Sequence, residues 1–390
     1  MAPKLVIYFR NYAVICRIQS TVLYPTWPMK QKIVFLTPYP YNTAPSQRFR
    51  FEQYYTLLEQ KGYTVCKYSF LSQATWRMLY LPGHQVQKVA GIVAGMLRRV
   101  AHLFHCLSAH AVFIHREASP LGPPLFEWIL AKVLRKRLIF DYDDAIWLEN
   151  TSAENRWVAS LKNHSKFYQI VKWAKVISAG NAYLANEAKK IRAEQVYINP
   201  TTVDATYHKR PVSAGRKEGP IRIGWTGSQS TMQYLDQVQG VLQDLVDRHD
   251  VEVEVISNRA PDLQLDKLRF ILWDKQTEIT QLSRFDIGIM PLTADRWSEG
   301  KCGFKVIQYF ALGIPVVASP VGVNVELVEP GVNGYLATEA SEWYQHLEDL
   351  ILSAAKRTRL GSHGRKKVET TYSVQGNSAN FLRLFDALAT

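Results

Sequence analysis

The sequence predicts two α/β domains, each a doubly wound parallel sheet, facing each other across a cleft. Three observations predict this architecture. The chain has 390 residues, more than one hydrophobic core usually serves. Short apolar runs alternate with helical stretches in both halves, a spacing typical of βαβ units. A polar stretch, residues 209–220, contains two prolines, two glycines and four basic residues and marks the domain boundary.

The elements of the first half are recognised by their apolar patterns. Short apolar runs predict strands, and apolar residues at a spacing of three or four predict helices. The expected strands are 33–37, 65–70, 111–115 and 138–142, and the expected helices are 47–62 and 125–134.

The second half begins the same alternation again after residue 220. A helix is expected from about residue 232, and another from 304 to 312, where Gly313 ends it. The expected strands are 221–225, 251–256, 287–291 and 315–318. In such sheets ligands bind at the carboxyl ends of the strands.

Composition excludes several classes of protein. The chain is 47% hydrophobic, 12% aromatic and 21% charged, which excludes disordered, collagenous and coiled-coil proteins. Its four cysteines are widely spaced without a Cys-x-x-Cys pair, so we expect neither a disulfide framework nor a structural zinc site. The net charge of +13 favours polyanionic ligands, but no nucleic-acid-binding module is recognisable, so we expect no nucleic-acid partner.

The N-terminal segment has a pattern of its own. Residues 1–28 contain an apolar stretch interrupted by Arg10 and Arg17, without a small-residue cleavage site, which does not fit a signal peptide. A strand pattern begins directly after Met29. We therefore interpret residues 1–28 as an upstream extension, a hypothesis that N-terminal sequencing of the natively expressed protein tests. No stretch is apolar enough to span a bilayer, since 86–107 is interrupted by charges.

The helix 304–312 is the strongest candidate for a ligand site. A glycine-containing loop precedes it, and the free N–H groups at a helix N-terminus can hold a phosphate. Lys301 and Lys305 are four residues apart and so share a face. Gln308 follows one turn later and can reach a sugar or ribose hydroxyl. The alternative is a surface helix with two solvated lysines.

The segment around this helix resembles the donor-binding region of the family 4 glycosyltransferases. The resemblance rests on Gly-Phe-Lys-x-x-Gln-Tyr-x-Ala-x-Gly-x-Pro-Val-Val-Ala-Ser from residue 303, followed by Gly322 and Glu326. Pro-Gly-Val-Asn-Gly-Tyr from residue 330, and the strand patterns at 221–228 and 285–292, extend it over most of 32–390.

The resemblance implies a retaining enzyme of the GT-B fold that uses a nucleotide-sugar and no bound metal. It also implies an acceptor-binding domain at 29–208, a donor-binding domain at 209–372, and a C-terminal helix, 373–390, that crosses back onto the first domain.

The sequence departs from the family pattern at two places. Family members usually carry two glutamates around the donor helix, whereas this chain has Gly300 and Gln308 there, with Glu299 one residue away. The usual Arg and Lys after the first strand of the second domain are replaced by Gly227-Ser-Gln-Ser-Thr. We therefore expect Lys305, Lys301 and the helix end to neutralise the diphosphate.

Polar residues in the first half follow the predicted strands. Arg48 and Arg50 follow the first strand and either bind an anionic acceptor or form a solvated helical turn. His115 and Arg116 end the third, and either line the cleft or serve a structural role. The acidic group at residues 141–144 ends the fourth and is compatible with a metal ion, with positioning of an acceptor hydroxyl, or with helix capping.

The predicted site residues fall into three groups. Predicted catalytic residues are Lys305, Asp144 and His115. Predicted donor-binding residues are Gly227, Ser228, Lys301, Gly303, Lys305, Gln308, Gly322 and Glu326. Predicted acceptor-binding residues are Arg48, Arg50, Arg116 and Asp143.

The resulting functional hypothesis is transfer of a hexosyl group from a nucleotide-sugar to a glycan or lipid-linked hydroxyl acceptor, in surface polysaccharide or glycolipid synthesis. Two alternatives remain: a non-catalytic nucleotide- or glycan-binding scaffold of this fold, and a nucleotide-sugar epimerase. We expect a cytoplasmic protein, at the inner face of the plasma membrane if the basic stretches 86–104 and 132–137 rest on anionic lipid. Their alternative is an ordinary core helix with a charged outer face.

Overall fold

The computed structural model describes residues 31–79, 81, 83–149, 162–211 and 219–389. The predicted extension, 1–28, and residues 212–218 of the predicted boundary lie outside the described residues. Among those described, no helix is both long and apolar enough to cross a membrane.

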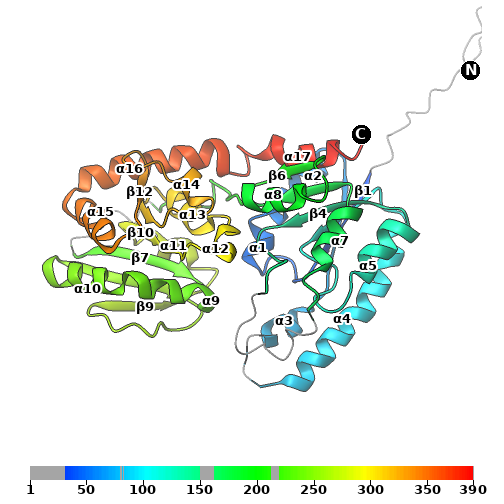
Figure 1. Cartoon of the computed structure of the whole chain (residues 1–390), viewed down its shortest axis with the longest axis horizontal. Coiled ribbons are helices and arrows are strands. Elements are labelled where there is room, and N and C mark those ends of the chain that lie inside the picture. Colours follow the sequence, from blue (N-terminus) through cyan, green and yellow to red (C-terminus); the bar gives the residue numbers. More distant parts are fainter. Residues whose placement is uncertain (1–30, 80, 82, 150–161, 212–218, 390) are drawn as a thin grey trace, which may run out of the picture. The chain divides into compact units, whose positions relative to one another are not determined.

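The first domain is built on a six-stranded parallel sheet in the order β2-β1-β3-β4-β5-β6 (Figure 1). Its strands are β1 (Lys32–Thr37), β2 (Thr64–Ser69), β3 (Ala111–His115), β4 (Arg137–Tyr142), β5 (Val176–Ala179) and β6 (Val196–Ile198). Its helical segments are α1 (Pro45–Arg48), the 3₁₀ turn η1 (Glu52–Tyr54), α2 (Tyr55–Gln60), α3 (Gln73–Leu79), α4 (Gln85–Cys106), α5 (Leu125–Trp128), the π-helical turn η2 (Ile129–Val133), α7 (Lys166–Trp173) and α8 (Ala182–Lys189).

Strand periodicity divides the core of this sheet between its two faces. Val34 and Leu36 of β1 contribute to one buried cluster, and Ile33 and Phe35 contribute to another, because successive side chains of a strand point to opposite faces. The C-terminal helix α17 (Ser378–Asp386) packs into the second of these clusters. The end of the chain therefore covers one face of the first sheet.

The second domain is a six-stranded parallel sheet in the order β12-β11-β10-β7-β8-β9. Its strands are β7 (Ile221–Gly227), β8 (Val251–Ser257), β9 (Leu268–Leu272), β10 (Ile287–Met290), β11 (Val316–Ala318) and β12 (Gly334–Leu336). Its helices and turns are α9 (Gln229–Met232), η5 (Gln233–Val238), α10 (Gln239–Arg248), α11 (Glu278–Leu282), α12 (Arg296–Glu299), α13 (Phe304–Ala311), α14 (Asn324–Leu327), α15 (Ala340–Leu352), α16 (Ala354–Lys367) and η6 (Val368–Tyr372).

Strand order locates the part of each domain that can bind a ligand. In the second sheet the order reverses between β7 and β10, and in the first between β1 and β3. Ligands of open parallel sheets bind at such switch points, beyond the carboxyl ends of the strands. The predicted class, two doubly wound α/β domains, is confirmed.

The helix predicted for residues 47–62 is interrupted in the structure. Phe51 has φ −140° between α1 and η1, so the segment forms three short pieces. The interruption accompanies burial of Arg50 and Phe51, both 0% exposed, under the sheet. Tertiary packing thus overrides the local helical pattern.

Candidate functional site

A group of four charged side chains, here called the charge chain, lies at the carboxyl ends of β3 and β4. It consists of Arg116, Asp143, Asp144 and Lys301. Arg116 donates from Nε to Asp143 Oδ1 at 2.7 Å and from Nη2 to Asp144 Oδ2 at 2.6 Å. Lys301, from the loop before α13, approaches the other oxygen of Asp144 at 3.0 Å. Predicted acceptor and catalytic residues of the first domain therefore meet a predicted donor residue of the second.

The charges of this group suit binding more than proton transfer. Burial raises the pKa of the Asp144 carboxyl, but the positive charges of Lys301 and Arg116 outweigh it and hold that pKa below its usual range. A carboxylate with a lowered pKa is a weak base at neutral pH. Asp144 can therefore accept a hydrogen bond from a hydroxyl and orient it.

Two further predicted residues, Arg50 and His115, are buried beneath the charge chain. Arg50 and His115 are both 0% exposed. Arg50 pairs with Asp141 and donates to the carbonyl of Asn199, while His115 Nδ1 lies 2.8 Å from Asp141 Oδ2. Burial opposes ionisation of Asp141, but Arg50 and His115 outweigh it and hold its pKa far below the usual range.

Because Arg50 is completely buried by these contacts, its guanidinium group cannot contact an acceptor in this conformation. His115 is equally enclosed, but its second ring nitrogen faces the charge chain. Among the described residues Nε2 of His115 has no hydrogen-bond partner, and it lies 3.9 Å from Asp143 Oδ1. This second ring nitrogen of His115 therefore faces the carboxylate of Asp143 from the buried side of the charge chain.

Arg48 and Gln308 meet at Glu278 of α11, a residue that the sequence analysis missed. Arg48 Nη2 lies 3.4 Å from Glu278 Oε2, and Gln308 donates from Nε2 to Glu278 Oε1 at 3.3 Å. Gln308 is only 2% exposed. Its amide is thus engaged inside the protein, and a contact with a ribose requires the Glu278 bond to open.

The N-terminus of α13 holds the predicted donor residues Gly303 and Lys305. Gly303 adopts φ +64°, and a Cβ there would lie 2.2 Å from Leu327 Cδ1, so this position favours glycine. The ammonium group of Lys305 lies 5.4 Å from the centre of the Trp225 ring. Burial, reinforced by the nearby charge of Lys301, lowers the pKa of Lys305 to about 7.

Two further glycines shape the loops around this helix. Gly227 ends β7, and a Cβ there would lie 2.5 Å from the Trp225 ring; Ser228 follows as the exposed N-cap of α9. Gly322, with φ +55°, brings the loop after β11 against the backbone of Glu299. The structure thus brings Gly227 and Lys305 to the same tryptophan.

Glu326 is not brought to this group. It lies exposed on α14, where its main-chain carbonyl accepts a bond from Lys367. A contact between Glu326 and a sugar remains a prediction.

Asn181 is a second residue that the sequence analysis missed. Its side-chain amide donates to the carbonyls of Glu299 and Lys301, both at 3.0 Å, and its oxygen caps α8 through Leu184 N. An asparagine after a strand signals a helix cap. Nothing in the sequence signals its contacts with a loop more than a hundred residues away.

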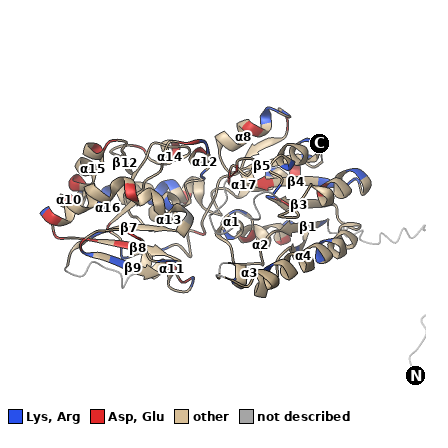
Figure 2. Ribbon diagram, turned by 60° about the horizontal axis from the view of Figure 1, so that its bottom comes forward, with Lys and Arg blue, Asp and Glu red and all other residues tan. Residues whose placement is uncertain are grey.

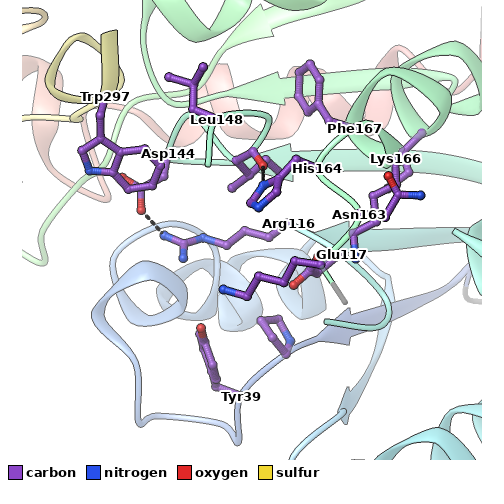
Figure 3. A pocket seen from close by; sticks show the side chains of 14 residues that line it. Tyr39, Arg116, Glu117, Asp144, Leu148, Asn163, His164, Lys166, Phe167 and Trp297 are labelled. Carbon is purple, nitrogen blue, oxygen red and sulfur yellow. Dashed lines mark hydrogen bonds and ion pairs between the residues drawn. The ribbon is translucent and has the colours of Figure 1, made fainter. Parts of the chain in front are cut away.

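A cavity of about 210 Å³ lies beside the charge chain (Figure 3). Its wall combines apolar and aromatic side chains with polar groups that can bind hydroxyls. The lining residues are Pro38, Tyr39, Arg116, Glu117, Asp144, Ile146, Leu148, Lys162, Asn163, His164, Lys166, Phe167, Ile170 and Trp297.

Several polar groups of this wall are already oriented. Lys166 pairs with Glu117 at 2.5 Å and donates to the Ser119 carbonyl, and His164 Nδ1 lies 3.1 Å from the Ile146 carbonyl. Among the described residues no group of three His, Cys, Asp or Glu side chains is arranged to hold a metal ion.

Comparisons with known proteins agree with this architecture. Residues 222–353 match the family model "Glycosyl transferases group 1". The chain is 24% identical over 212 residues to spore coat protein SA of Bacillus subtilis; the match covers 46% of this chain and about half, 55%, of that curated relative.

Solved structures match nearly the whole chain. HepE of Anabaena, in complex with UDP-glucose, has a TM-score of 0.62 at 16% identity, with 91% of this chain and 99% of that one covered. A glycosyltransferase of Rickettsia africae has a TM-score of 0.66 at 14% identity, covering 93% and 99%. Sucrose-phosphate synthase of Thermosynechococcus elongatus has a TM-score of 0.63 at 12% identity, covering 92% and 99%. The predicted GT-B fold is confirmed.

Proposed function

From the GT-B fold and the glycosyl transferase match across residues 222–353, we propose that this protein is a glycosyltransferase that uses a nucleotide-sugar donor. The HepE complex, which holds UDP-glucose, supports a uridine diphosphate sugar as the first donor to test. We further propose, from the motif at residues 303–319, that the enzyme belongs to the retaining family 4.

One observation carries the proposal, namely the environment of Lys305. Its ammonium group lies over Trp225, at the first turn of α13, with a pKa lowered to about 7. A cation held where burial disfavours its charge gains free energy when an anion arrives. A diphosphate at the α13 N-terminus supplies that anion, and the free N–H groups there add to its binding.

The proposed reaction follows from these placements. The bond between the anomeric carbon and the donor phosphate breaks, and a bond to the acceptor oxygen forms on the same face of the sugar. The acceptor proton passes to a phosphate oxygen of the leaving nucleoside diphosphate. Lys305, supported by Lys301 and the α13 end, stabilises the charge of the leaving group.

The acceptor is proposed to occupy the cavity beside Asp144 and Arg116. Hydroxyl groups suit its wall, since Tyr39, Asn163 and His164 bring polar groups next to the apolar side chains. Asp144 orients the reacting hydroxyl. A glycan or lipid-linked acceptor in surface polysaccharide or glycolipid synthesis is our proposal for its class. Because lysines and a helix end supply the positive charge, we also propose a metal-independent reaction.

A second candidate, a non-catalytic scaffold of the same fold, is favoured by one feature of the donor helix. Gly300 and Gln308 stand where glutamates usually stand in the family, and Gln308 is bonded to Glu278 inside the protein. Such a protein would bind a nucleotide without turnover.

Thermal unfolding with uridine, adenosine and guanosine diphosphates and their sugars tests the proposal. We expect one base to raise the unfolding midpoint, Lys305→Ala to abolish the rise, and the exposed control Lys189→Ala to retain it. Release of nucleoside diphosphate that depends on a hydroxyl acceptor then separates the enzyme from the scaffold. A wild type that no nucleotide stabilises contradicts donor binding.

A further inference from the structure

Helix α4 presents an apolar stripe to solvent. The α4 stripe consists of Val86, Val89, Val93, Leu97, Val100, Phe104 and, just beyond the helix end, Leu107. These side chains are 48–80% exposed. Their spacing of three or four residues places them within an arc of about 80° around a helix of 3.6 residues per turn.

The opposite side of α4 is firmly attached to the first domain. A Cβ on Gly95 would lie 2.5 Å from the Phe70 ring, so the helix backbone is in close contact there. Arg99 is fully buried and donates to the carbonyls of Ala118 at 2.8 Å and Thr37 at 2.9 Å. These contacts fix the orientation of α4 on the first domain, and the side chains of the α4 stripe therefore face solvent. Soluble proteins rarely expose a continuous apolar row of this length without a partner.

The charge around the α4 stripe has one sign. No aspartate or glutamate occurs between Glu59 and Glu117, a stretch that includes α3 and α4. Figure 2 shows lysine and arginine, but no acidic residue, on these two helices. The lysines and arginines of the stretch are Lys61, Lys67, Arg77, Lys88, Arg98, Arg99 and Arg116.

A group of exposed cations lies at the C-terminal end of α4. The Lys136 ammonium donates to the carbonyls of Leu107 at 2.7 Å and Ala109 at 3.1 Å, which ties the segment after η2 to this helix end. Lys132 within η2, and Arg135 and Arg137 after it, are exposed and are here called the basic cluster.

Apolar side chains accompany the basic cluster. Helix α5 packs beside α4. Within α5 and η2, Leu125 is 53% exposed, Trp128 44% and Val133 56%. An exposed tryptophan next to lysines and arginines is typical of surfaces that contact the headgroup region of a bilayer.

We propose that the α4 stripe and the basic cluster form a docking surface for a bilayer that contains anionic lipids. Aliphatic and aromatic side chains enter the headgroup boundary, and the cations bind lipid phosphates. Pairing of the surface with a second copy of itself is disfavoured, because two acid-free surfaces would bring like charges together. This inference does not depend on glycosyl transfer.

Vesicle co-sedimentation tests the surface, with phosphatidylcholine vesicles with and without phosphatidylglycerol. We expect the wild type to bind only the anionic vesicles, and more weakly as salt increases. Lys132→Gln with Arg135→Gln removes two cations, each of which strengthens binding about fivefold, so binding is expected to fall about 25-fold. Leu97→Ser with Phe104→Ser removes two inserting side chains and weakens binding by about tenfold or more.

Matched controls come from elsewhere on the chain. Lys189→Gln with Lys366→Gln removes the same charge from exposed positions on α8 and α16, and Leu352→Ser removes a side chain that is 70% exposed on α15. We expect these variants to bind vesicles like the wild type. All variants are checked for an unchanged unfolding midpoint, and Val93→Ser replaces any stripe variant that fails to fold.

Three results would overturn the proposal. The first is a wild type that does not sediment with anionic vesicles. The second is an equal loss of binding in the control variants, which would indicate net charge alone. The third is a wild-type dimer that Leu97→Ser with Phe104→Ser converts to monomer, because the stripe would then be an interface between copies.

Discussion

The ammonium group of Lys301 lies 3.0 Å from the carboxylate of Asp144, 157 residues earlier in the chain. This pair ties the loop before α13 to the end of β4, and Asn181 holds the same loop through two backbone carbonyls. The charge of Lys301 is thus already partnered. Lys305 has no such pair in the described residues, which makes it the stronger candidate for contact with a diphosphate.

The Lys301–Asp144 pair is expected to stabilise the protein modestly. Both side chains are 20% exposed, so we expect a coupling free energy of about 1 kcal/mol between Lys301→Gln and Asp144→Asn in a double-mutant cycle of urea unfolding. Because the folded state lowers the pKa of Asp144, this contribution is present at neutral pH and is lost as the pH falls through that lowered pKa. Strictly additive effects would show that the pair contributes nothing.

Binding of UDP-glucose, the donor proposed above, is expected to depend on pH through Lys305. The free protein holds this lysine with a pKa of about 7, so its cation is present below pH 7 and is lost above it. Affinity is therefore expected to be constant below about pH 7 and to fall by up to about tenfold per pH unit above it. Calorimetric titration at fixed ionic strength measures this profile.

Lys305→Arg provides the control for that profile. Arginine keeps its charge across the same range, so we expect the affinity of this variant to be flat where that of the wild type falls. Identical profiles for the two proteins would assign the pH dependence to another group.

Removal of one partner from the buried pair of Arg50 and Asp141 is expected to destabilise the first domain strongly. Both side chains are 0% exposed, and removal of one partner leaves an uncompensated buried charge. We expect Asp141→Asn to lower the free energy of unfolding by about 3–5 kcal/mol. Ser178→Ala removes only a hydroxyl that donates to Asp141 at 2.6 Å and is expected to cost about 1 kcal/mol. Urea denaturation measures the free energy of unfolding of both variants. A similar small loss of stability in both would contradict the prediction that Asp141 is ionised and neutralises Arg50.

Local pattern predicted many of the strands, although the fully buried strand β5 was not among them. Strands such as β1 and β3 have continuous apolar runs because both faces of a parallel sheet are covered. The edge strand β9 (Leu268–Leu272) was missed as well; its residues are half-buried or exposed, and Arg269 interrupts its apolar residues. The interrupted helix at residues 47–62 was missed because packing of Phe51, not the local spacing, decides it.

The difference between local sequence pattern and tertiary contacts also explains which residues of the candidate site were predicted. Lys305 and Gly303 were predicted because a motif of neighbouring residues identifies a helix N-terminus. Glu278 and Asn181 were not, since their partners are distant in sequence: Arg48 is 230 residues from Glu278. No spacing rule connects such residues, so their roles follow only from the folded structure.

Gly303 offers a test of how tightly the start of α13 is built. Gly303 and Gly331 both have positive φ, +64° and +75°, so alanine at either position incurs a left-handed backbone cost of about 1–2 kcal/mol. They differ in space: a Cβ on Gly303 would lie 2.2 Å from Leu327 Cδ1 and 2.9 Å from Val323 Cγ1, whereas Gly331 has no atom within 4 Å. Gly303→Ala is therefore expected to lower the free energy of unfolding by about 1–3 kcal/mol more than Gly331→Ala.

The steric part of this cost is separable from the backbone part. In a Leu327→Ala background the nearest atom is gone, so the additional cost of Gly303→Ala is expected to shrink, while the cost of Gly331→Ala stays the same. Urea unfolding of the single and double variants measures both. Since a forced shift of Gly303 also displaces the N–H groups of α13, Gly303→Ala is expected to weaken UDP-glucose binding and Gly331→Ala to leave it unchanged. Equal effects of the two alanines on stability would mean that α14 shifts without cost to make room for the new Cβ. Equal effects on binding would mean that close packing at Gly303 does not position the N-terminus of α13 for a phosphate.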